Sequence, residues 1–120
     1  MTSTTPYKPG DVILVRIKFT EDDRTKKRPA VILTDDNYHG SRSDAIVVAL
    51  SSSPHAMTNL YFGDYILGDW KAAHLPLPSK AKGVLQTIDR TTIEKTFGQL
   101  SDNDYKNLKA CISTVLCLHS

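Results

Sequence analysis

Four cations lie close together early in the chain, and their types suit a phosphodiester. Arg24, Lys26, Lys27 and Arg28 fall within a stretch of five residues, and Ser51 supplies a hydroxyl after a later apolar run. An arginine guanidinium offers a rigid fork of donors to the non-bridging oxygens of a phosphate, and a hydroxyl adds one more donor. The pattern therefore indicates phosphate binding, although a run of charges is also typical of a solvated loop.

Other common chemistries are poorly supported by the residue types and their spacing. The histidines match no zinc signature, and we expect them on the surface: His39, His55, His74 and His119. The acidic pairs at 22–23 and 35–36 fall in polar stretches and are typical of solvated turns rather than of a cation site. Cys111 and Cys117 have neither metal nor redox spacing, so we expect two reduced, partly buried thiols. We predict no metal and no cofactor.

Length and composition limit the remaining possibilities. The 120 residues leave room for one domain, which we place at residues 9–120 after a flexible leader at 1–8. The net charge of +2 excludes a strongly basic, histone-like coat for nucleic acid, but it allows a local basic patch. The longest apolar run, residues 45–50, is too short to cross a bilayer, and residues 1–6 do not resemble a secretory signal. We therefore expect a cytoplasmic protein with no membrane partner.

The elements that position the cations and Ser51 are mainly strands. Alternation predicts a strand at 12–19, a polar loop at 20–27 and a short apolar strand after Arg28-Pro29. Pro29 cannot donate to a ladder, so it belongs at the start of that strand or beside an edge. The remaining predicted strands cover residues 44–50, 59–66 and 83–88, with a loop at 35–43 and an extended link at 75–79.

The C-terminal third contains one clear helix and one ambiguous segment. Ser101 and Asp104 resemble a capping box, and apolar residues then recur at helical spacing, which predicts an amphipathic helix against one end of a curled antiparallel sheet. Residues 91–97 fit either a capped helix beginning at Thr91 or a strand, because they are rich in β-branched residues.

Three blocks of the sequence resemble the MazF/PemK family of toxin endoribonucleases in order and spacing. The blocks are Gly10-Asp11-Val12-Ile13-Leu14-Val15, Lys27-Arg28-Pro29-Ala30-Val31-Ile32-Leu33 and Ala45-Ile46-Val47-Val48-Ala49-Leu50-Ser51. Later matches are Trp70, Leu75, Pro78-Ser79, Leu85-Gln86-Thr87-Ile88-Asp89 and Gly98-Gln99-Leu100-Ser101. The resemblance covers roughly residues 9 to 116, nearly the whole chain.

The resemblance implies a mainly β fold, a small curled antiparallel SH3-like barrel with a C-terminal helix, usually in a homodimer. It also implies a turn at 90–92 followed by a strand at 93–99. Members of the family typically cut single-stranded RNA at short sequences without a metal and leave a cyclic phosphate. A cognate antitoxin holds them inactive, and its tail follows the RNA groove.

Residue by residue, the resemblance places the family's catalytic arginine at Arg28. Ser51 falls where the family usually has threonine, so the hydroxyl is kept and the methyl that restricts its rotamer is lost. Gln86 stands where some members carry a basic residue, and His74 replaces a usual glycine.

The implied reaction is attack by the RNA's own 2′-hydroxyl on the neighbouring phosphorus. Arg28 would stabilise the developing charge and assist proton transfer to the leaving 5′-oxygen, and Ser51 would donate to a non-bridging oxygen. An arginine is a poor base, so the base that accepts the proton of the 2′-hydroxyl has to be another residue. His55 is one candidate, and the alternative is that it is an ordinary histidine in a loop. The candidate RNA-binding residues are Arg24, Lys26, Lys27, Ser52, His55, Trp70, Lys80 and Gln86.

Three aromatic residues, Trp70, Tyr61 and Phe62, could stack on an unpaired base, or they could serve a core or a dimer interface. The loop at 20–27 could act as a gate that RNA orders or the antitoxin blocks. Two rival functions share the same fold. One is a non-catalytic toxin that binds and poisons a topoisomerase, and the other is a degenerate interaction module. The pairing of Arg28 with Ser51 favours the nuclease.

Overall fold

The computed structural model describes residues 7–18 and 25–118 of the chain. In chain order its elements are β1 (Asp11–Lys18), β2 (Thr25–Ile32), α1 (Asp36–Ser41), β3 (Asp44–Ser51), α2 (Pro54–Thr58), β4 (Tyr65–Ile66), β5 (Lys80–Asp89), the short 3-10 helix η1 (Arg90–Thr92), β6 (Ile93–Gln99) and α3 (Asp102–Val115). Within these described ranges, no helix combines the length and apolar character needed to span a membrane.

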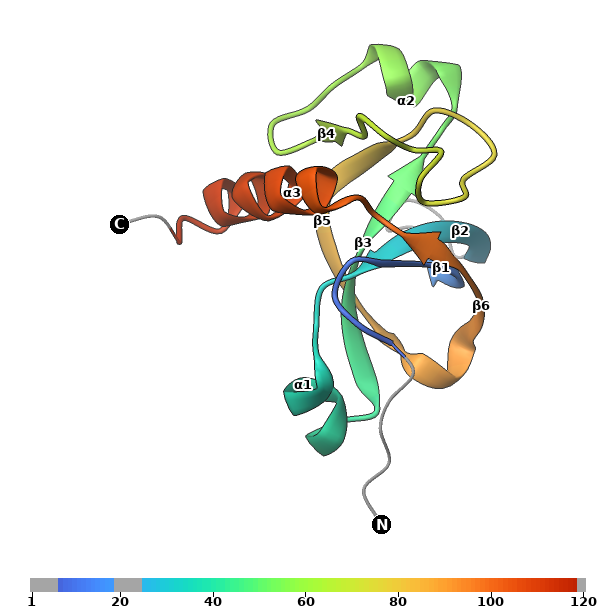
Figure 1. The fold of residues 1–120 in the computed structure, drawn as a ribbon, viewed down its shortest axis with the longest axis vertical. Coiled ribbons are helices and arrows are strands. Elements are labelled where there is room, and N and C mark those ends of the chain that lie inside the picture. Colours follow the sequence, from blue (N-terminus) through green and yellow to red (C-terminus); the bar gives the residue numbers. More distant parts are fainter. Residues whose placement is uncertain (1–6, 19–24, 119–120) are drawn as a thin grey trace.

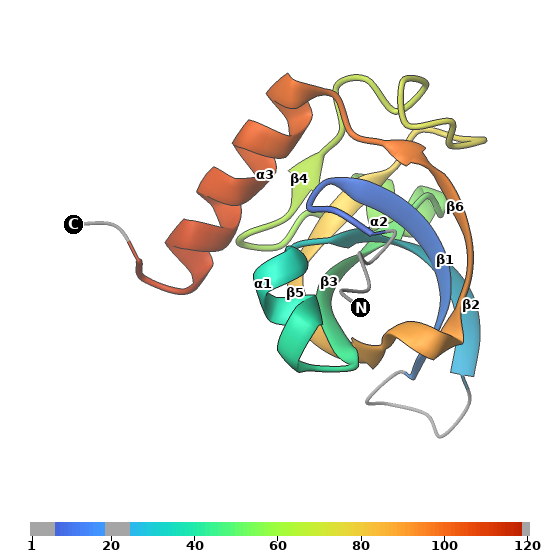
Figure 2. The ribbon, with the colours of Figure 1, turned by 60° about the horizontal axis from the view of Figure 1, so that its bottom comes forward.

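The strands form one antiparallel sheet in the order β4-β5-β3-β2-β1-β6. Figures 1 and 2 show this sheet curling round on itself, with α3 on the outside of the curl. Register shifts where β1 meets β6 and where β3 meets β5 increase the local twist and so help the sheet to curl. The predicted barrel is not closed: in the described part of the chain, β4 and β6 remain the two edges of the sheet.

Side chains alternate between two buried clusters along the central strands. On β2, Val31 belongs to the cluster that Leu108 of α3 completes, whereas Ala30 and Ile32 belong to the cluster on the opposite face. Successive residues of a strand point to opposite faces, so every second residue shares a cluster. By this alternation Arg28 lies on the same face as Ala30 and Ile32.

The C-terminal helix is capped and anchored by polar side chains. Ser101 Oγ accepts a hydrogen bond from the Asp104 N–H, which confirms the predicted helix start. The buried Asp104 carboxylate accepts hydrogen bonds from Tyr65 Oη at 2.6 Å and from the N–H groups of Gly68 and Asp69, each at 2.8 Å. Burial alone would raise the pKa of Asp104, but these hydrogen bonds lower it below its usual range. This carboxylate therefore ties the segment after β4 to α3.

The predicted loop at 20–27 is wrong at its end, because β2 already begins at Thr25. Lys27 pairs with Arg16 of β1, so the second half of the cationic stretch is a strand. The missing signal is tertiary, since the neighbouring strand provides a pairing partner that local polarity does not reveal. Residues 19–24, including Arg24 and most of the predicted gate, lie outside the described residues.

The predicted strand at 59–66 is also wrong, apart from Tyr65 and Ile66. Its first part turns back: the Asp64 N–H donates to the carbonyl of Tyr61, and Gly63 has a φ of +90°. A positive φ favours glycine and is incompatible with an extended strand. The apparent aromatic strand is therefore a turn followed by a two-residue edge strand.

Two short helices were not predicted: α1 lies in the stretch predicted as a loop at 35–43, and α2 follows the third strand. The Asp35 side chain caps α1 by accepting from the N–H of Asn37 at 3.0 Å, and Ser53 Oγ caps α2 by accepting from the N–H of Ala56 at 3.1 Å. The prediction of a turn carboxylate at 35–36 is confirmed, because Asp35 caps the start of α1. The turn at Arg90–Thr92 and the strand at Ile93–Gln99, which the resemblance implied, are confirmed as η1 and β6.

The expectation of a surface position is wrong for His39. Its ring is buried, and Nε2 lies 2.6 Å from Thr34 Oγ1, while the Arg90 guanidinium donates to the carbonyl of His39 at 2.9 Å. Burial, followed by the nearby Arg90 charge, lowers the pKa of His39. Cys117 also differs from expectation, because its side chain is exposed rather than partly buried.

Candidate active site

The two predicted catalytic residues lie on neighbouring strands, Arg28 within β2 and Ser51 at the end of β3. Arg28 is half-buried on β2, and Ser51 is the half-buried last residue of β3. The two strands pair antiparallel, with Ala30 opposite Ala49. Continuing this register by two residues sets Arg28 opposite Ser51, and the alternation of side chains keeps both on the face of Ala30 and Ala49.

Pro29 explains why the pairing of β2 with β3 stops short of Arg28. Its ring removes the N–H that a ladder requires, so β2 pairs with β3 only from Ala30 onward. On its other side β2 stays paired with β1 through Leu14 and Pro29. The prediction that Pro29 begins a strand or lies beside an edge is wrong: β2 begins at Thr25, and Pro29 lies inside this interior strand of the sheet.

A guanidinium and a hydroxyl on one face of two neighbouring strands form a set of hydrogen-bond donors. Arginine carries its charge throughout the physiological pH range and only donates, whereas serine donates and accepts. Such a pair can bind the non-bridging oxygens of a phosphate and stabilise added negative charge there. The arrangement is suited to chemistry at a phosphate group.

Two lysines of β2, Lys26 and Lys27, were predicted to bind phosphate, and they differ in their contacts within the protein. Lys26 is exposed on β2. Lys27 Nζ lies 2.9 Å from Oε1 of Glu94 on β6, and Arg16 Nε lies 4.0 Å from Oε2 of the same carboxylate. The Lys27 and Glu94 side chains are 48% and 38% exposed, so water screens this ion pair. Lys27 is therefore available to an incoming phosphate in competition with Glu94.

Lys80 is placed very differently from the other predicted RNA contacts. It stands opposite Ser51 on β5, but its side chain is only 2% exposed. Its Nζ donates to Asp64 Oδ2 at 2.6 Å and to the carbonyl of Asn59 at 2.8 Å. The ammonium group thus holds the 59–64 segment against β5 rather than facing the solvent.

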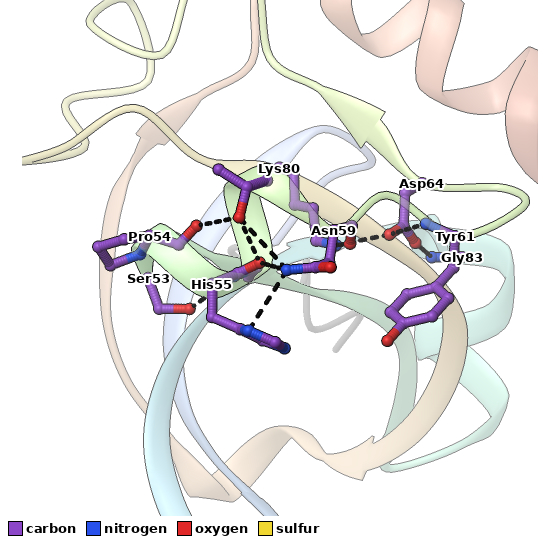
Figure 3. Close-up of polar contacts among 10 residues, drawn as sticks. Ser53, Pro54, His55, Asn59, Tyr61, Asp64, Lys80 and Gly83 are labelled. Carbon is purple, nitrogen blue, oxygen red and sulfur yellow. Dashed lines mark hydrogen bonds and ion pairs between the residues drawn. The ribbon is translucent and has the colours of Figure 1, made fainter.

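Asp64 completes this buried contact from the other side. It accepts from the N–H of Tyr61 at 3.0 Å and from the N–H of Gly83 at 2.9 Å (Figure 3). Burial alone would raise the pKa of Asp64, but the Lys80 ammonium and the two backbone N–H groups together lower it. The carboxylate is therefore ionised and fixed near the end of β3.

His55 and Ser52 follow Ser51 closely along the chain. Ser52 is half-buried in the turn before α2, and His55 is an exposed residue of α2. His55 Nδ1 lies 3.3 Å from Asn59 Nδ2, and the same amide nitrogen donates to the carbonyl of His55 at 2.7 Å. These contacts with Asn59 hold the ring of His55 on α2, the helix that follows β3 in the chain.

Gln86 and Trp70 occupy positions further from the strand ends. Gln86 is half-buried on β5 opposite Val47, on the same face as Ile88. Trp70 packs against the cluster that α3 covers, with Lys71 Nζ 5.5 Å from its ring centroid. Its half-buried indole therefore contributes to the core.

The backbone of His74 has a left-handed conformation, as expected at a position where the resemblance implies glycine. Its φ is +59°, a value at which glycine is favoured, and the resemblance had implied a glycine here. Its Nδ1 lies 3.0 Å from the carbonyl of Phe97, and a Cβ on Gly98 would come within 2.7 Å of the same nitrogen. The hydrogen bond and the bare backbone of Gly98 accommodate the side chain.

Three residues that interact with the predicted site residues were not predicted from the sequence: Glu94, Asp64 and Asn59. Glu94 falls in the segment that fitted either helix or strand, so no pairing could be inferred for it. Asp64 and Asn59 fall in a stretch mistaken for a strand. The one available signal was Gly63 followed by Asp64, a pair typical of turns rather than of strands.

Comparison with known proteins identifies the family. A family model described as the PemK-like, MazF-like toxin of type II toxin-antitoxin systems matches residues 8–116. No curated protein sequence matches the chain significantly.

Solved structures share the fold at low sequence identity. An endoribonuclease in complex with its cognate antitoxin from a mycobacterial species has 13% identity and a TM-score of 0.73, over 95% of this chain and 98% of that chain. A MazE-MazF structure from Deinococcus radiodurans has 14% identity and a TM-score of 0.70, over 94% and 98%. The Mycobacterium tuberculosis toxin MazF-mt6 has 16% identity and a TM-score of 0.67, over 90% and 99%. Since the family model covers nearly the whole chain and the curled sheet matches these structures, the chain belongs to the PemK-like, MazF-like toxins of type II toxin-antitoxin systems.

Proposed function

We propose that this toxin is a sequence-specific endoribonuclease that cleaves single-stranded RNA at the Arg28–Ser51 site. The observation that supports the proposal is the β2–β3 register: continued by two residues beyond the Ala30–Ala49 pair, it would bring Arg28 opposite Ser51 on one face. Two of the structural neighbours are described as endoribonucleases, which supports the same activity for this chain. Cleavage of messenger RNA would inhibit translation and arrest growth.

The reaction begins with in-line attack by a ribose 2′-hydroxyl on the adjacent phosphorus. The new bond joins the 2′-oxygen to phosphorus as the bond to the 5′-oxygen breaks, so the products are a 2′,3′-cyclic phosphate and a free 5′-hydroxyl. Because the nucleophile belongs to the substrate, the step requires no metal-bound water. The protein has to position the phosphate and stabilise its developing charge.

Arg28 and Ser51 divide this work by their chemistry. The Arg28 guanidinium binds the non-bridging oxygens, whose negative charge grows in the transition state, and helps to protonate the leaving 5′-oxygen. The Ser51 hydroxyl donates to one of the same oxygens. His55, which follows Ser51 in the chain and lies on α2, is the candidate base for the 2′-hydroxyl, since a neutral imidazole has one ring nitrogen that can accept a proton.

The exposed lysines of β2 provide the flanking contacts. Lys26 and Lys27 bind neighbouring phosphates by charge, which makes RNA affinity fall with rising salt. Two neighbouring structures contain a MazE or cognate antitoxin chain. We include a cognate antitoxin among the partners of this chain, bound over the same RNA site, and a homodimer as its working form.

The direct test is cleavage of a panel of single-stranded RNAs in the presence of EDTA. We expect cleavage that yields a cyclic phosphate, and no cleavage of a copy with a single 2′-deoxy sugar at the mapped cut site. A divalent-metal requirement, or cleavage of the deoxy copy, would contradict the proposed reaction. Growth arrest on expression without cleavage of any RNA would favour a non-catalytic toxin of the same fold.

A further inference from the structure

A pocket of about 400 Å³ lies next to the proposed cleavage site, between α2, the 59–64 segment and β5. Its lining residues are His55, Ala56, Asn59, Tyr61, Phe62, Asp64, Lys80, Lys82, Gly83 and Val84. Lys80 is the β5 residue directly opposite Ser51, so the pocket begins one strand away from the proposed catalytic hydroxyl. Its volume falls within the range of about 300–1,000 Å³ that is typical of small-ligand sites.

The base of the pocket is rigid. The buried Lys80–Asp64 ion pair and the hydrogen bond from Lys80 to the Asn59 carbonyl tie the 59–64 segment to β5. A Cβ at Gly83 would lie 2.9 Å from the Gly63 carbonyl carbon, so only glycine permits the segment to approach this closely. The pocket is therefore formed before any ligand binds.

The walls of the pocket expose apolar groups. Tyr61 is 70% exposed, Phe62 is 77% exposed and Val84 is 57% exposed. Of the alternatives for Tyr61 and Phe62, a place in the core is thus wrong, whereas base stacking and a dimer interface both remain. Lys80 Nζ lies over one face of the Tyr61 ring, 5.5 Å from its centroid. Exposed aromatic rings beside a phosphate-binding site are suited to stacking on unpaired bases, since every base has a π-face.

The same pocket holds polar atoms that could read the edge of a base. The Asn59 amide nitrogen is held by the carbonyl of His55, while its Oδ1 accepts no hydrogen bond from the described residues. His55 Nε2 likewise has no partner among the described residues. Figure 3 shows the rings of His55 and Tyr61 extending in the same direction, on either side of Asn59.

We propose that this pocket binds one unpaired nucleobase of the RNA substrate, adjacent to the phosphate held by Arg28 and Ser51. The inference rests on the proposed nuclease function and adds the part of the site that selects sequence. Tyr61 and Phe62 stack on the base, and Asn59 Oδ1 contacts its edge. A base that presents no donor to Asn59 Oδ1 leaves that acceptor unpaired and is disfavoured.

The test uses RNA oligonucleotides with 2′-O-methyl sugars, which lack the attacking hydroxyl, and a 2-aminopurine base placed at each position in turn. We expect a change in fluorescence at one position within two nucleotides of the cut. Phe62→Ala and Tyr61→Ala should remove this change and weaken binding about tenfold. The matched control is Leu77→Ala, which truncates another exposed apolar side chain, 53% exposed and outside the pocket, and should change neither readout.

Sequencing of the fragments cut from an RNA with a randomised segment gives the second readout. Phe62→Ala should still cut RNA but relax the preference at the same position. Unchanged fluorescence and unchanged preference in both aromatic variants would overturn the inference. So would a loss of self-association in Phe62→Ala by sedimentation without an effect on RNA, because the ring would then face a second copy of the chain.

The two proposals can fail separately. Cleavage by the wild-type protein with no position-specific fluorescence would overturn the base pocket and leave the nuclease intact. Position-specific fluorescence without cleavage of any RNA would overturn the nuclease and leave the pocket as a base-binding site. Absence of both would overturn both.

Discussion

Two lysine–carboxylate pairs in this toxin have the same chemistry and opposite surroundings. Lys80 and Asp64 are 2.6 Å apart, with side chains 2% and 5% exposed. Lys27 and Glu94 are 2.9 Å apart, with side chains 48% and 38% exposed. The buried pair holds a loop in place because neither charge can return to water, whereas the exposed pair can exchange its partner for a phosphate. Burial, rather than residue type, thus decides which cations are available to RNA.

The largest effect should come from breaking the buried pair. Lys80→Met leaves Asp64 charged and without its partner in a buried site, and we expect a loss of about 3–5 kcal/mol in the free energy of unfolding. Urea unfolding measures it, with Lys27→Met as the matched control at about 0–1 kcal/mol. Equal losses in the two variants would remove the distinction between the pairs.

The second buried carboxylate should show a smaller effect that depends on pH. Asp104→Asn directs an amide N–H toward the Asp69 N–H, so we expect a loss of about 2 kcal/mol in unfolding free energy at pH 7. The lowered pKa of Asp104 stabilises the fold above the unfolded value near 3.8, and this contribution disappears as pH falls through the lower folded value. The gap between wild type and variant should narrow in acid, and a gap that widens there would contradict the assignment.

For the exposed pair, the expected effect is on RNA rather than on stability. Lys27→Ala should change unfolding free energy by less than about 1 kcal/mol. It should also reduce the slope of log affinity against log salt by about 0.7, the value for one phosphate contact to a single strand. A titration of uncleavable RNA at several salt concentrations measures this slope. An unchanged slope would show that Lys27 does not contact phosphate.

The smallest effect, and one of opposite sign, should come from the carboxylate of the exposed pair. Glu94→Gln removes the charge that competes with phosphate for Lys27 and Arg16, so RNA affinity should rise a few-fold and its salt dependence should steepen. The same titration measures both quantities. Weaker binding in this variant would show that Glu94 orients the lysine rather than competing for it.

Much of the fold could be predicted from local patterns in the sequence. The apolar run at 44–50 and the capping pair Ser101 and Asp104 define β3 and the start of α3, because each depends on neighbours in the chain. The start of β2 at Thr25 could not be predicted in this way, since its polar residues become a strand only by pairing with β1. The turn at 61–64 was hidden by aromatic residues that are common in strands.

The candidate site was partly predictable for the same reason. Arg28 and Ser51 could be chosen from the resemblance, and the register of β2 and β3, continued two residues past the Ala30–Ala49 pair, agrees with that choice. Lys80 was grouped with the exposed cations because nothing near it in the sequence indicates its buried partner, which lies 16 residues away. Composition counts charges but carries no information on which of them are buried.

The central claim is that Arg28 and Ser51 act on the same phosphate, and a double-mutant cycle on cleavage tests it most directly. Arg28→Ala should lower kcat/KM about 10²–10³-fold, and Ser51→Ala should lower it less, with Ser51→Thr as a control that keeps the hydroxyl. The account predicts that the double variant is about as slow as Arg28→Ala alone, with thermal unfolding unchanged in each protein. A double variant whose loss in kcat/KM equals the product of the two single losses would contradict a shared role at one phosphate. A Ser51→Ala protein as fast as wild type would contradict it as well.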